Sequence, residues 1–216
     1  MKRTKITILF LILAQLAFGQ IHVQVQWGTE SITLGKSYAY GKDSISFDQL
    51  KLYLTDFQFE GSTRKAIKVG AHLIDLESPE SMNLFPEFST GNYRTMSFQF
   101  GLDSSYHVSE SVTGDLDPLK GMYWAWNSGY IQFKCTGKST RIPTDDRLFE
   151  YHLGGYRKPN ETMVHVTIEM KGDILVLDLK PFFEKDAQLE QVQRIMIPSP
   201  LAKSYCQSIA YYFYSK

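Results

Sequence analysis

Two tryptophans separated by one residue stand in the middle of the chain, and a histidine follows them at some distance. Trp124 and Trp126 come after a turn rich in glycine and proline, and His152 precedes the pair Gly154-Gly155. An imidazole nitrogen can bind a metal ion, whereas an intact indole offers only an N–H donor. Because the chain has only three tryptophans, this grouping indicates either aromatic core packing or a metal site with a histidine ligand.

The five histidines show no short-range metal-ligand spacing, so a metal site would have to be assembled from distant segments. They are His22, His72, His107, His152 and His165. Strand alternation places His22 and His165 on polar faces, where we expect them to be solvated. His72 falls in a strand with no partner suggested nearby. His107 falls in a polar connection, a place where binding groups often occur.

Other catalytic signatures are absent from the sequence. It contains no G-x-S-x-G nucleophile elbow, phosphate-binding loop, dinucleotide fingerprint or HExxH zinc motif. Asp115 and Asp117 form a carboxylate pair of the kind that serves acid–base chemistry. The sequence Asp-x-Asp-Pro is more typical of a turn in which the aspartates accept backbone hydrogen bonds. With no convincing nucleophile or acid–base pair, we expect a protein that is not an enzyme.

Residues 1–19 have the pattern of a signal peptide. Lys2, Arg3 and Lys5 form a basic head, an apolar run follows, and Ala-Phe-Gly offers a cleavage site. The apolar run is too short for a comfortable membrane span, and no later stretch is long enough. We therefore expect a mature chain that begins near Gln20, has no membrane span, and is periplasmic or secreted.

Charge and cysteine content narrow the remaining classes. The formal net charge is zero and becomes about −3 without the three basic residues of the leader, which argues against nucleic-acid binding. Cys135 and Cys206 are too few for a disulfide scaffold, although a single bond would be compatible with export. The sequence leaves this bond open, because it does not give the distance between the two residues.

Alternation of apolar and polar residues dominates the chain and predicts strands. The apolar positions of the three clearest segments are Val23, Val25 and Trp27; Met96, Phe98, Phe100 and Leu102; and Val164, Val166, Ile168 and Met170. We predict that the last segment forms a hairpin with residues 174–179 through a turn at 171–173. Residues 44–59 read as one long strand or two, with a bulge or bend near Asp56.

Helical periodicity is clear only near the end. Ser199 can cap a helix that begins at Pro200, with Leu201, Tyr205 and Ile209 on one face. Residues 182–192 are a second, shorter candidate. We therefore predict one all-β domain over residues 20–216: an antiparallel β-sandwich with one or two short helices near the C-terminus. An aromatic content of 14% suits such a core without requiring a ligand.

Three segments carry a resemblance to a known family. They read DLDP at 115–118, GMYWAWNSGY at 121–130 and F-x-YHLGG at 149–155. Together they resemble the MbnP-like copper-binding protein family, which includes the periplasmic protein encoded beside methanobactin genes. The likeness extends to residues 50–59, 73–75 and 100–103, and so covers most of the mature chain. The tryptophan pair followed by the H-[LI]-G motif is specific as a combination.

The resemblance implies an exported β-sandwich that binds copper. In characterised relatives one tryptophan is oxidised to kynurenine and joins histidines around the metal, and a di-haem oxidase partner makes this modification. Opening the indole ring exposes an aryl amine and a ketone, which can ligate. His152 falls on the family's histidine motif, and His107 lies close to the position of a second histidine. Trp124 and Trp126 fall on the W-x-W pair, and either of them could be the oxidised residue.

Three interpretations follow. The first is a copper-binding protein that uses His152, His107 and an oxidised Trp124 or Trp126. The second is a non-enzymatic binding module whose aromatic surface, made of Tyr123, Trp124, Trp126 and Tyr130, meets a partner or a glycan. The third is an enzyme. Strand alternation puts both tryptophans on one face, so the burial of that face separates the first two interpretations.

Overall fold

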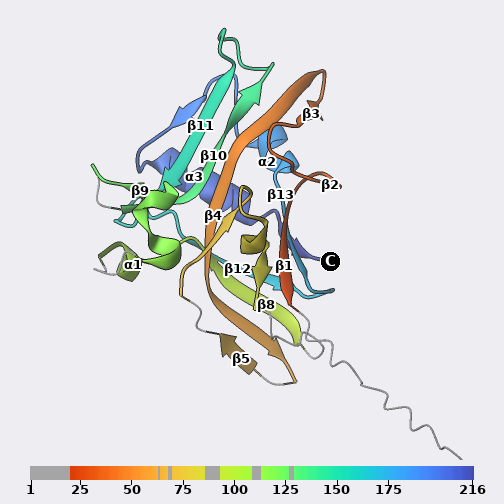
Figure 1. The fold of residues 1–216 in the computed structure, drawn as a ribbon, viewed down its shortest axis with the longest axis vertical. Helices are drawn as coiled ribbons and strands as arrows, with labels where there is room; N and C mark the ends of the chain where they lie inside the picture. Colours follow the sequence, from red (N-terminus) through yellow and green to blue (C-terminus); the bar gives the residue numbers. More distant parts are fainter. Residues whose placement is uncertain (1–19, 63, 68–69, 86–92, 109–112, 127–128) are drawn as a thin grey trace, which may run out of the picture.

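The computed structural model describes residues 20–216, apart from residues 63, 68–69, 86–92, 109–112 and 127–128. The expected signal peptide, residues 1–19, lies outside the described residues. Strands make up most of the regular structure, and they form two sheets that pack face to face (Figure 1). The predicted β-sandwich is therefore confirmed.

The smaller sheet joins strands from both ends of the chain, in the order β15-β13-β1-β2, with β7 paired to β1. β1 lies parallel to β13, and the other pairs are antiparallel. Its strands are β1 (Ile21–Trp27), β2 (Glu30–Ser31), β7 (Asn83–Leu84), β13 (Ile174–Asp178) and β15 (Phe213–Ser215).

The larger sheet has the order β12-β8-β4-β10-β11-β14, with β3, β5 and β6 paired to β4 and β9 paired to β10. Its strands are β3 (Ser37–Tyr40), β4 (Asp43–Gly61), β5 (Arg64–Ile67), β6 (His72–Asp75), β8 (Tyr93–Phe100), β9 (Tyr123–Trp124), β10 (Gly129–Ser139), β11 (Leu148–Gly154), β12 (Val164–Glu169) and β14 (Arg194–Ile195). Its pairs are antiparallel except β11 with β14.

β4 is one continuous strand that runs along the middle of the molecule (Figure 1). The predicted bulge is confirmed, because Asp56 has a φ of 53° and the register with β8 shifts between Thr55 and Gln58. A bulge inserts an unpaired residue and bends the strand. This bend lets one strand pair with β10 at one end and with β8 at the other.

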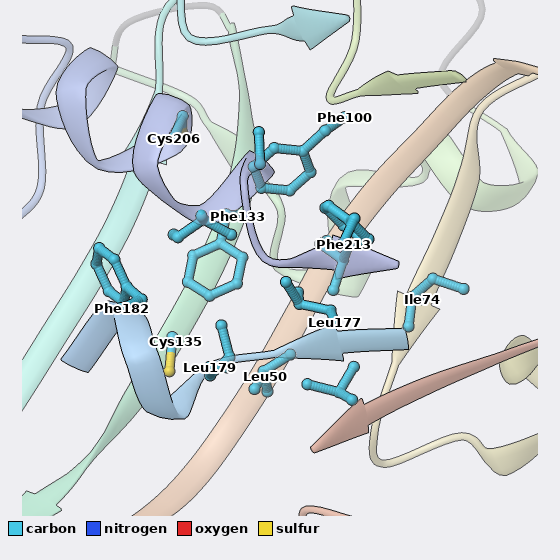
Figure 2. Close-up of a cluster of buried hydrophobic side chains, with 14 of the residues drawn as sticks. Leu50, Ile74, Phe100, Phe133, Cys135, Leu177, Leu179, Phe182, Cys206 and Phe213 are labelled. Atoms are coloured by element: carbon cyan, nitrogen blue, oxygen red, sulfur yellow. The ribbon is translucent and has the colours of Figure 1, made fainter. Parts of the chain in front are cut away.

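The core between the sheets is almost entirely apolar and rich in aromatic rings. Figure 2 shows side chains from both sheets meeting there with those of α2 and α3. The predicted inward residues of β1 (Val23, Val25 and Trp27) and of β8 (Met96, Phe98 and Phe100) are buried in this core, which confirms the alternation for both strands. Leu102, predicted on the same face, follows the end of β8 and packs in a second, smaller apolar cluster instead. Burial of apolar surface contributes roughly 25 cal/mol per Å², so this layer supplies most of the stability of the fold.

The predicted inner face of β12 is also confirmed. Val166 is buried and its apolar neighbours are half-buried against the core, whereas His165 is exposed. The predicted hairpin is wrong, however. β12 pairs with β8 in the larger sheet, and β13 pairs with β1 and β15 in the smaller one. Alternation reports which face is apolar but not which strand lies alongside, and residues 171–173 here carry the chain from one sheet to the other.

The helices are short: α1 (Ser104–Val108), α2 (Lys180–Lys185) and α3 (Pro200–Ala210), with 3-10 turns η1 (Pro79–Met82), η2 (Gly114–Leu116) and η3 (Pro118–Lys120). α3 is capped as predicted, since the Ser199 hydroxyl accepts a hydrogen bond from the Ala202 N–H at 3.1 Å. Leu201 is exposed, so the buried face runs through Ala202, Tyr205 and Ile209 instead. α2 begins before residue 182 and ends at Lys185. In the part of the chain that the structure describes, no helix is long and apolar enough to cross a membrane.

The two cysteines do not form a disulfide in this structure. Cys135 lies in β10 and Cys206 in α3, and both are buried as free thiols in the core (Figure 2). Burial raises the pKa of both thiols well above the usual range. Both therefore act as small apolar core residues.

Candidate functional site

A second, smaller apolar cluster lies on the face of the larger sheet that points away from the core. We call it the outer cluster, and its buried members are Tyr53, Leu73, Leu102, Leu116, Met122, Trp124, Tyr130 and Ile131. α1, η2 and β9, with Met122 before β9, cover this face (Figure 1). Two tyrosine hydroxyls of the sheet hydrogen-bond to this covering segment. Tyr53 donates to the Asp115 carbonyl at 2.8 Å, and Tyr130 donates to the Leu116 carbonyl at 2.9 Å.

The two aspartates of the Asp-x-Asp-Pro sequence shape this cover, which confirms the interpretation as a turn. The Asp115 carboxylate accepts the Leu73 N–H at 3.0 Å and the Lys120 ammonium at 2.6 Å. Asp117 caps η3 by accepting the Leu119 N–H at 2.9 Å. These hydrogen bonds fix the path of the chain immediately before the tryptophan pair.

The two tryptophans lie side by side but in different environments. Their ring centroids are 5.7 Å apart; Trp124 is 6% exposed and Trp126 is 64% exposed. The predicted shared strand face is therefore wrong. β9 ends at Trp124 and the chain turns at the next residue, so strand alternation no longer applies at Trp126.

The predicted aromatic surface does not form either. Tyr130 is 2% exposed and Tyr123 is half-buried, and their rings meet edge to face at 5.0 Å inside the outer cluster. Of the four aromatic residues proposed for that surface, only Trp126 is exposed. A broad aromatic binding face is absent at this position.

His152 lies in β11 directly opposite Lys134 of β10. It shares a strand face with Gly154, and Trp124 packs on that glycine. Among the described residues, its Nε2 is buried and has no hydrogen-bond partner. Burial, with a smaller contribution from the positive charge of Lys134, lowers the pKa of His152 to about 4. The imidazole is therefore neutral at neutral pH, and a buried nitrogen without a partner costs roughly 1–3 kcal/mol.

Lys134 is a site residue that the sequence reasoning missed. Its ammonium crosses the outer face and donates to the Gly121 carbonyl at 3.2 Å, so it links β10 to the loop before the tryptophans. Burial, together with the nearby charge of Lys51, lowers the pKa of Lys134. Alternation in β10 could have placed Lys134 on the outer face, but its position opposite His152 depends on the pairing of two strands.

His107 lies in α1, where its side chain is buried and both ring nitrogens have polar neighbours. Its Nδ1 accepts the Tyr130 N–H at 3.0 Å, and its Nε2 lies 3.1 Å from the Gln132 amide nitrogen. The ring stacks on Tyr156 with centroids 4.4 Å apart. Burial lowers the pKa of His107 to about 4, although a hydrogen bond with the Leu102 backbone opposes the shift. In this arrangement His107 anchors α1 to β10, with the buried Gln132 as part of the anchor.

The structure thus brings together the tryptophan pair and the strand that bears His152, whereas His107 has separate partners. Across the described ranges, no group of three or more histidine, cysteine or acidic side chains could hold a metal ion. Two other histidines have structural bonds: His22 Nδ1 lies 3.0 Å from Asn83 Oδ1, and His72 Nε2 donates to the Ser81 carbonyl at 2.7 Å. His165 is exposed, as predicted.

Comparison with known proteins places these features in a family. The solved structure of MbnP from Methylosinus trichosporium is similar to this fold, with a TM-score of 0.54, 15% sequence identity, and 77% of each chain covered. No curated protein matches the sequence. The family model described as MbnP matches residues 17–198. Because this match spans most of the sequence, the chain belongs to the MbnP family.

Proposed function

We propose that this protein is an exported, periplasmic or secreted copper-binding protein of the methanobactin-associated kind, with His152 as its first ligand. The observation that carries the proposal is the Nε2 atom of His152, which is buried without a hydrogen-bond partner in the described structure. It lies on the strand face against which Trp124 packs. A neutral imidazole with a free lone pair is the form that binds copper.

Among the residues present, His152 can provide one imidazole ligand to copper. The other ligands would have to come from elsewhere in the protein. The described residues hold no cluster of three ordinary metal-ligating side chains. One source is His107, which would have to release the Tyr130 N–H before its Nδ1 could ligate. The other is an oxidised tryptophan, since the rings of Trp124 and Trp126 are adjacent.

Oxidation of a tryptophan would supply new donor atoms. With hydrogen peroxide as the oxidant, a di-haem oxidase partner would add one oxygen atom from each of two peroxide molecules across the C2–C3 bond of the indole, giving N-formylkynurenine and two molecules of water. Water would then release formate and leave an aryl amine and a ketone. The exposure of Trp126 gives such a partner a contact point, and Trp124 lies directly behind it. Both tryptophans fall in one tryptic peptide, residues 121–134, so fragmentation of that peptide in a tandem mass spectrometer decides which ring is converted.

The protein would hold the copper ion tightly and could pass it to another ligand. The chain would bind the ion without catalysing a reaction. His152 would offer its neutral nitrogen, and the outer cluster would keep water away from it. The nearby Lys134 ammonium repels cations, and this repulsion is weaker for a monovalent ion than for a divalent one. The proposal is therefore for Cu(I), held by few donors.

Copper affinity of the His152→Ala variant tests the proposal. Protein from its native host is titrated with Cu(I) in competition with a chromogenic chelator, and His165→Ala is the matched control. We expect loss of tight binding for His152→Ala and wild-type affinity for the control. Equal affinities of wild type and His152→Ala would exclude His152 as a ligand. Intact mass of the same wild-type sample checks for kynurenine, which gains one oxygen and loses one carbon.

A further inference from the structure

β12 is an edge strand of the larger sheet, at the opposite end of the strand order from β11 and β14. In the described structure it pairs with β8 and with no other strand. An edge strand presents unpaired backbone groups that can pair with another chain. This surface is unrelated to the proposed function.

The backbone of β12 alternates in direction, and one hydrogen bond fixes which residues point outward. The Met170 N–H, immediately after the strand, donates to the Arg94 carbonyl of the β8 side at 2.8 Å. Even-numbered residues of β12 therefore direct their backbone groups toward β8. The N–H and C=O groups of His165, Thr167 and Glu169 point to the open edge.

A groove runs beside this edge, with a volume of about 590 Å³. β12 forms one side, and the end of α3 and the start of β15 form the other; the lining residues include Gln207, Tyr211 and Phe213. Tyr211 is 86% exposed. Exposed tyrosine beside an unpaired strand is typical of interfaces, where aromatic residues supply much of the binding energy.

We propose that a second copy of this chain pairs with β12 through its own β12, antiparallel and centred on Thr167. This register sets Thr167 against Thr167 of the partner subunit and His165 against Glu169 of the partner subunit. All three outward residues then form hydrogen-bonded pairs, so the backbone pattern closes without a gap. The pairing joins the two larger sheets into one continuous sheet with two-fold symmetry.

The side chains agree with this register. His165 and Glu169 are exposed on the same strand face. The two-fold symmetry therefore creates two equivalent contacts, in each of which the imidazole N–H of one copy faces the Glu169 carboxylate of the partner subunit. Directly opposed pairs of opposite polarity stabilise a sheet. Residues 164–169 also contain no proline, no lysine and no bulge, three of the devices that protect edge strands.

Charge exchange across the interface tests the proposal. Sedimentation velocity of residues 20–216 is measured over a concentration series. We expect a monomer–dimer equilibrium that weakens about tenfold in His165→Glu, where two pairs of carboxylates oppose each other, and by a smaller amount in Glu169→Lys. The double variant His165→Glu/Glu169→Lys should recover dimerisation, because opposite charges face each other again.

Two further variants separate this interface from a general charge effect. Glu190→Lys makes the same charge change on an exposed residue outside β12 and should leave dimerisation unchanged. Tyr211→Ser should weaken it without lowering the thermal unfolding temperature. A wild-type chain that stays monomeric at every concentration overturns the proposal. So does a double variant that dimerises no better than the single ones, or a groove that accepts only an extended peptide of another protein.

Discussion

Trp124 packs its indole ring directly onto the backbone of Gly154. A Cβ atom added at Gly154 would lie 2.9 Å from Cζ3 of Trp124 and 2.7 Å from the Tyr130 carbonyl oxygen. Glycine is therefore required here by space, because any side chain would collide with the indole ring and with the Tyr130 carbonyl. This contact links the tryptophan pair to the strand that bears His152. A substitution in β11 should therefore change the environment of the tryptophan rings.

Replacing Gly154 with alanine should displace the Trp124 ring. We expect the free energy of unfolding to fall by about 1–3 kcal/mol, the usual cost of overpacking, together with a change in tryptophan fluorescence. Urea unfolding followed by fluorescence measures both. Gly70→Ala is the control, since a Cβ there meets nothing within 4 Å; equal stability of the two variants would contradict the contact.

Removing the charge of Lys134 should raise the pKa of His152. The ammonium lies opposite the imidazole and disfavours its protonated form. In Lys134→Met we expect the pKa to rise from about 4 while staying below the ordinary histidine value, because burial remains. NMR titration of the His152 ring measures the shift. Lys138→Met, an exposed position of the same strand, should leave the pKa unchanged, and a shift of equal size there would contradict the prediction.

Acid should destabilise the fold through its buried neutral histidines. The pKa of His107 is lowered from 6.5 to about 4 by burial, so the unfolded chain binds a proton that the folded chain does not. Stability should therefore fall as the pH drops from about 6.5 to about 4, by up to about 3 kcal/mol for this residue. Urea unfolding at several pH values measures this dependence, and the free energy of unfolding should change less steeply with pH in His107→Gln than in the wild type. His165→Gln should keep the wild-type slope.

The two tryptophans should differ in stability and access. Trp126 is largely exposed, so Trp126→Phe should change the free energy of unfolding by no more than about 0.5 kcal/mol. Trp124→Ala should cost about 3–5 kcal/mol, because it empties a buried position. Iodide should quench fluorescence in the wild type and in Trp124→Phe but far less in Trp126→Phe. Strong quenching that persists in Trp126→Phe would show that Trp124 is not shielded.

The sequence predicted which face of a strand is buried better than it predicted which strands pair. Val166 and its alternate residues point inward as expected, because alternation depends only on the local pleat. The pairing of β12 with β8 was missed, since it depends on where the next apolar strand finds its own partners. Trp126 was placed on the wrong face because a turn follows β9 directly, and alternation ends with the strand.

The site was predicted in part for the same reason. The motif around His152 predicted that its strand lies near Trp124, and the structure places Trp124 against Gly154 of that strand; the role of His152 as a ligand stays a prediction. The surroundings of His107 could not be anticipated. Its partners Tyr130, Gln132 and Tyr156 come from other segments, and no local pattern links them to α1. Lys134 was missed because its significance arises only from the register between β10 and β11.

The parallel pairing of β1 with β13 has a consequence for how the chain folds. His22 is paired with Ile174, so β1 can gain its parallel partner only after most of the polypeptide has been made, although β2 and β7 can pair with it earlier. Contacts between residues so distant in sequence slow folding, because loop closure must be completed before they stabilise anything. The smaller sheet should therefore form late. Until then the apolar inner face of the larger sheet stays uncovered, which makes this the stage at which the chain is most prone to aggregate.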